Sequence, residues 1–96
     1  MSEEMKKVNE AELEQAAGGI GPNGWATVCG LKTGWLAMRT APTYDYGNEM
    51  RGNELYNGDR VQITGSYVQG YDGRTYVWVY SPKTNASGYV NAAYIA

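Results

Sequence analysis

From about residue 25 onward, hydrophobic positions alternate with polar ones in short runs, as they do in β-strands with one buried face. Val61 and Ile63, for example, alternate with the polar residues around them, and clusters of Gly, Asn and Asp bound most of the runs. No window after Ile20 has the period of an amphipathic helix. The pattern predicts an all-β domain with five short strands, at residues 26–29, 35–39, 60–67, 74–81 and 88–90.

The segments between these strands also carry structural signals. Pro42 ends the second predicted strand, because proline has no N–H to donate to a ladder, and an irregular loop is expected from Thr43 to about Glu54. Tyr71-Asp72-Gly73 predicts a hairpin turn, and Pro82–Ser87 predicts a polar loop. Residues 91–94 are expected to form one turn of 3₁₀ helix.

The first nineteen residues differ in composition from the remainder. Five of the seventeen residues before Gly18 are Glu and none is aromatic, whereas every Trp, Tyr, Pro and Cys follows Gly19. Asn9 predicts the N-cap of a helix of about eight residues, too short to be stable alone in water. The change predicts a disordered or partly helical leader at residues 1–19 and a separate domain at residues 20–96.

This segment resembles the double-glycine leader of bacteriocin-type peptides. The resemblance rests on Glu12-Leu13, on Ala16 four places before the cut, and on the Gly18-Gly19 pair. It implies cleavage behind Gly19 and secretion by an ABC transporter with its own peptidase domain, which would place residues 20–96 outside the cell or on its wall. Two glycines let an extended backbone enter a narrow protease cleft. The positions implied in leader recognition are Val8, Glu12, Leu13 and Ala16. A flexible linker behind an acidic tail is the alternative.

The charge and composition of the chain limit the kinds of partner and of catalytic site that it can have. Residues 20–96 carry six basic and five acidic residues, which gives no electrostatic reason to expect nucleic acid or an anionic membrane as partner. The chain contains no His, which excludes His-based triads and His-ligated zinc. The lone Cys29 is expected to be a small buried hydrophobe, with a bond to another chain as the alternative. We therefore expect a monomeric binding protein and no enzyme, metal site, cofactor or membrane insertion.

The body of the chain resembles the bacterial SH3 (SH3b) family in the order and spacing of four segments: Ala26–Val28, Leu36–Pro42, Leu55–Ile63 and Gly88–Ile95. The resemblance implies a small SH3-like barrel of about five short strands with a terminal 3₁₀ turn. It also implies that Val77 and Val79 face the core, which leaves Tyr76, Trp78 and Tyr80 on the outside of their strand. The expected core comprises Leu36, Met38, Val61, Ile63, Val77, Val79 and Val90.

The aromatic residues are the candidate ligand-binding set. Tyr44 and Tyr46 lie on the long loop, where binding contacts concentrate, and Tyr94 lies on the terminal turn that borders the same groove in SH3-like barrels. Trp78 is a large side chain at an outward position. Packing over the core is the alternative for all of them. SH3b domains commonly bind cell walls, so the expected ligand is peptidoglycan or another surface polymer. The alternative is an extended peptide of a partner protein.

Overall fold

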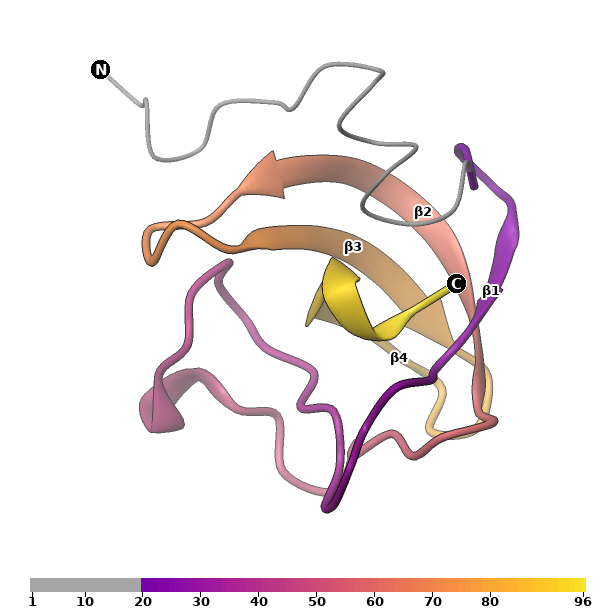
Figure 1. Ribbon diagram of the computed structural model, residues 1–96, viewed down its shortest axis with the longest axis horizontal. Helices are drawn as coiled ribbons and strands as arrows, with labels where there is room; N and C mark the ends of the chain where they lie inside the picture. Colours follow the sequence, from indigo (N-terminus) through magenta and orange to yellow (C-terminus); the bar gives the residue numbers. More distant parts are fainter. Residues whose placement is uncertain (1–19) are drawn as a thin grey trace.

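The computed structural model describes residues 20–96 (Figure 1). The proposed leader, with Val8, Glu12, Leu13, Ala16, Gly18 and Gly19, lies outside the described residues. The described part is a small all-β fold, as predicted. It contains one antiparallel sheet of four strands in the order β1-β2-β3-β4, with bounds Trp25–Thr27, Arg60–Gln69, Thr75–Ser81 and Ala86–Asn91.

The C-terminal segment lies beside the sheet. The predicted 3₁₀ turn is present as η3 (Ala92–Tyr94), and the Asn91 side chain caps it by accepting from the Ala93 N–H at 3.0 Å. In Figure 1 the sheet is strongly curved and η3 lies within the curve, against β3. Beyond the turn, Ala96 exchanges two backbone hydrogen bonds with Thr27 on the edge of β1.

The longest strand, β2, is bent where its pairing with β3 is irregular. The register shifts between Ile63 and Tyr67, and the strand then continues two residues beyond its predicted end because the pairing with β3 resumes. Gly65 lies at the irregularity, where a Cβ atom would come within 2.6 Å of the Trp78 Cβ. Glycine at this position therefore allows β2 and the Trp78 side chain to approach closely.

The predicted strand at residues 35–39 is wrong. In its place are isolated bridges, from Leu36 to Leu55 and from Arg39 to both Glu49 and Tyr89. Because the partner changes between Leu36 and Arg39, no continuous ladder forms. The polar loop predicted at residues 82–87 is shorter than expected, since β4 already begins at Ala86.

The predicted core is confirmed, because all seven residues named from the sequence are buried. Two other expectations fail. Tyr76 lies on the outward face of β3 but is only 1% exposed. Gly70 lies close to its ring, since a Cβ atom added at Gly70 would come within 2.7 Å of Tyr76 Cδ1, and the hydroxyl donates to Asp72. Cys29 is half-buried, not buried. Val28, the residue after β1, is fully buried and pairs with Ile95 in an isolated bridge, and alternation directs the next side chain away from the core.

Candidate functional site

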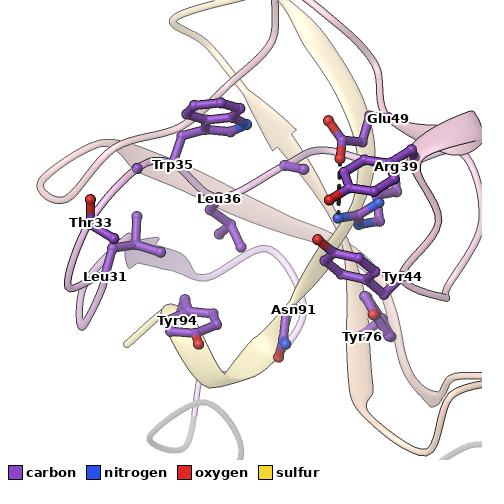
Figure 2. Close-up of a pocket in the computed structure, with 13 residues that line it drawn as sticks. Leu31, Thr33, Trp35, Leu36, Arg39, Tyr44, Glu49, Tyr76, Asn91 and Tyr94 are labelled. Atoms are coloured by element: carbon purple, nitrogen blue, oxygen red, sulfur yellow. Dashed lines mark ion pairs between the residues drawn. The ribbon is translucent and has the colours of Figure 1, made fainter.

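The described residues enclose an open groove of about 450 Å³ beside the curved sheet (Figure 2). It lies between two loops that follow the first strand and the C-terminal end of the chain. Figure 2 shows Trp35 and Leu36 on one side of it and Arg39 and Glu49 on the other. The lining residues are Leu31, Thr33, Gly34, Trp35, Leu36, Ala37, Arg39, Tyr44, Tyr46, Glu49, Tyr76, Asn91 and Tyr94.

The first wall is the loop from Leu31 to Leu36. The Asn57 side chain holds it at one end, accepting from the Leu31 N–H at 3.1 Å and donating to the Leu31 carbonyl at 2.8 Å. Gly34 has a φ of 73°, a conformation that glycine adopts without strain, and it turns the chain before Trp35. The Trp35 side chain is left 51% exposed at the groove.

The second wall is the long loop, and Arg39 fixes its shape from within. The buried guanidinium donates from Nη1 to the Asp45 carbonyl at 2.8 Å and to Asn48 Oδ1 at 3.0 Å. The short turn η2 (Tyr46–Asn48) begins here, where the Asp45 side chain accepts from the Gly47 N–H at 2.8 Å. Tyr46 therefore projects from a well-ordered turn with 72% of its surface exposed.

Tyr44 is held by several contacts. Its ring centre lies 4.5 Å from the Arg39 guanidinium and 5.8 Å from that of Arg74, and both are within cation–π range. Its ring also meets the Tyr46 ring edge-on, with the centroids 5.8 Å apart. The Tyr44 N–H donates to Asp72 Oδ2 at 3.0 Å, which ties the long loop to the hairpin turn between β2 and β3.

The Asp72 carboxylate is the shared acceptor that joins the long loop to the hairpin turn between β2 and β3. Besides the Tyr44 N–H, it accepts from the Tyr76 hydroxyl at 2.8 Å, from the Arg74 guanidinium at 2.8 Å and from the Arg74 backbone. Partial burial opposes ionisation of Asp72, but the hydrogen bonds outweigh it and lower its pKa to about 2. Burial raises the pKa of Tyr76 to about 12, and the hydrogen bond to Asp72 adds to this shift. At neutral pH, Asp72 is therefore an ionised carboxylate and Tyr76 a neutral phenol.

Three of the four aromatic residues proposed from the sequence meet in the groove: Tyr44, Tyr46 and Tyr94. Trp78 does not line it. Its half-buried ring packs edge-on against the Tyr89 ring, with the centroids 5.0 Å apart, on a different part of the sheet. The structure therefore separates Trp78 from the other candidates.

Among the groove residues that the sequence did not identify as ligand contacts, Trp35, Arg39 and Glu49 contribute most to the geometry of the site. The sequence predicts Trp35 as part of a strand, with packing over the face that carries Tyr76, Trp78 and Tyr80 as a further interpretation, although its place after Gly34 at a turn was a signal for a groove residue. Nothing in the sequence distinguished Arg39 and Glu49 from ordinary solvated charges. Their value to the site comes from the fold, which buries Arg39 and places Glu49 Oε2 3.7 Å from its Nη2.

The groove combines flat aromatic surfaces, phenolic hydroxyls and a single ion pair, which are groups suited to non-covalent recognition. Within residues 20–96, no cluster of three or more His, Cys, Asp or Glu side chains is placed to hold a metal ion. The same part of the chain has no helix with the length and apolar character needed to cross a membrane. Comparisons of the chain with known protein families, curated proteins and solved structures find no match, so its function is inferred from the groove itself.

Proposed function

We propose that residues 20–96 form an SH3-like binding module, exported after cleavage behind Gly19, that recognises peptidoglycan or another polymer of the cell surface. The pairing of Val28 with Ile95, and of Thr27 with Ala96, supports the barrel, because it joins the C-terminal end of the chain to the edge of β1. The double-glycine motif supports the export step, in which a peptidase-containing ABC transporter is the partner.

The observation that carries the binding proposal is the gathering of exposed aromatic side chains in one groove. Trp35, Tyr44 and Tyr46 are 51%, 54% and 72% exposed, and they come from two separate loops that are each held by specific hydrogen bonds. Exposed aromatic side chains cost stabilising burial, so their concentration around a hollow favours a ligand. Flat rings with hydroxyl groups suit sugar rings and extended peptide segments.

Sedimentation with purified cell-wall sacculi tests this proposal. The full chain should co-sediment, and Tyr46→Ala should weaken binding by more than about 1 kcal/mol. The matched control is Tyr71→Ala, since Tyr71 is 54% exposed but does not line the groove. Equal loss in both variants, or no binding by the unmodified chain, would refute cell-wall recognition through the groove. In the second case, an extended peptide of a partner protein becomes the ligand to test.

A further inference from the structure

The Arg39 side chain has hydrogen-bonding capacity that the described residues leave unused. Only 7% of the side chain is exposed, yet both of its hydrogen bonds to residues 20–96 come from Nη1. Its Nη2 approaches Glu49 Oε2 only to 3.7 Å, which is beyond hydrogen-bonding distance. Among residues 20–96, the buried side-chain polar atoms without a partner are Ser81 Oγ and Thr84 Oγ1, so Arg39 Nη2 is reached by solvent. Because Arg39 lines the groove, the Nη2 donors are available to an acceptor on a bound ligand.

The charges around this donor restrict the ligand. Arg39 and Glu49 are the two charged residues among those that line the groove, and they carry opposite charges. An anionic ligand at Arg39 would be repelled by Glu49, and a cation at Glu49 would be repelled by Arg39. A neutral group that presents an acceptor and a donor side by side satisfies both residues. A secondary amide has this arrangement.

We propose that Arg39 and Glu49 form a subsite for a secondary amide of the ligand. The amide carbonyl accepts from Arg39 Nη2, and the amide N–H donates to the Glu49 carboxylate. Because an amide is planar, it also fits against the flat rings of Tyr44 and Tyr46 that flank the pair. This inference rests on the proposed function and specifies the group recognised. The amide can come from the acetamido group of an amino sugar or from a peptide bond, and both occur in cell-wall polymers.

Nuclear magnetic resonance titration of the full chain with two pairs of neutral probes tests the subsite. The first pair is triacetylchitotriose and cellotriose, which differ by acetamido groups in place of hydroxyls. The second pair is a triglycine with blocked ends and its N-methylated analogue, which lacks the amide N–H. We expect the N–H-bearing member of at least one pair to shift the signals of Arg39 and Tyr46, and its matched control to bind at least about tenfold more weakly.

A pair of variants links the effect to the subsite. Glu49→Leu removes the acceptor at similar length and should weaken binding of the responsive probe about tenfold, whereas Glu54→Leu removes the same charge outside the groove and should leave binding unchanged. A spectrum with native dispersion checks the fold of each variant. A response by the sugar pair would identify an acetamido group as the ligand, and a response by the glycine pair would identify a peptide bond.

Two results would overturn the subsite: no binding by either amide probe, or binding by a probe that is unaffected by Glu49→Leu. Binding to sacculi separates this failure from failure of the proposed function. If sacculi bind through Tyr46 while the amide probes do not bind, the cell-wall function stands and the amide subsite is wrong. If an amide probe binds through Glu49 while sacculi do not bind, the subsite stands and the cell-wall function is wrong.

Discussion

Removal of the Asp72 charge should detach the long loop from the hairpin turn and destabilise the domain. Asp72 accepts hydrogen bonds from Tyr44, Arg74 and Tyr76, and its side chain is 16% exposed. Asp72→Asn keeps the shape of the side chain but replaces one acceptor oxygen by an NH₂ group that faces donors. The variant therefore tests the charge of the Asp72 carboxylate without opening a cavity.

The magnitude follows from the pKa of Asp72, which falls from its ordinary value of 3.8 to about 2 in the folded protein. At about 1.4 kcal/mol per pKa unit, this shift corresponds to about 2–3 kcal/mol of stability before screening by solvent. Because the residue as a whole is exposed to solvent, which screens its interactions, we expect Asp72→Asn to cost about 1–2 kcal/mol at neutral pH. A folded-state pKa below the unfolded value means that this stability is present above pH 3.8 and is lost as the pH falls towards 2.

Urea denaturation of both proteins between pH 7 and pH 2, followed by tryptophan fluorescence, measures the effect. The difference in unfolding free energy should be constant above about pH 5 and should shrink below pH 4 as Asp72 of the unmodified protein becomes protonated. Equal stabilities at pH 7 would show that the carboxylate does not hold the loop. A difference that persists undiminished at pH 2 would show that the lost stability is not linked to ionisation of Asp72.

Three further predictions concern the core, the bend in β2 and the leader. Ile63→Ala truncates a fully buried side chain and should lower the unfolding free energy by about 2–5 kcal/mol in urea denaturation; a loss below 1 kcal/mol would contradict its place in the core. Gly65→Ala should cost about 1–3 kcal/mol and alter tryptophan fluorescence, because the added Cβ would lie 2.6 Å from the Trp78 Cβ; unchanged stability and emission would refute this close approach. Gly19→Leu should block processing by a cognate transporter without changing the stability of the domain. Mass spectrometry of the secreted product should find Ile20 at the N-terminus of the unmodified protein, and any other start contradicts the double-glycine interpretation.

The parts of the fold that the sequence predicts well are those set by local alternation. Val61, Ile63, Val77 and Val79 occupy alternate positions of their strands, and one buried face requires all four to point inward. The expected strand at residues 35–39 failed because strand formation depends on partners far along the chain. Alternation is present there, but Leu36 and its neighbours meet a succession of different segments.

The aromatic part of the candidate site was predictable, because aromatic residues in a polar loop are recognisable from the sequence. Tyr44 and Tyr46 stand in a polar loop, and for that reason the sequence alone identifies them as candidate ligand contacts. Arg39 and Glu49 were not predictable, because a charge in a loop is usually solvated and only the folded chain shows that Arg39 is buried. Burial of Tyr76 was not predictable either, since it depends on how closely Gly70, just beyond β2, approaches its ring in the folded chain.

Recognition of the cell surface by the groove is tested most directly by mapping the contact surface of solubilised cell-wall fragments on the isotopically labelled full chain by nuclear magnetic resonance. We expect the largest backbone and side-chain shifts at Tyr44, Tyr46 and Tyr94, around the groove. Shifts centred instead on the Trp78–Tyr89 pair, or no shifts at saturating fragment concentration, would contradict the claim that the groove is a binding site for a cell-surface polymer.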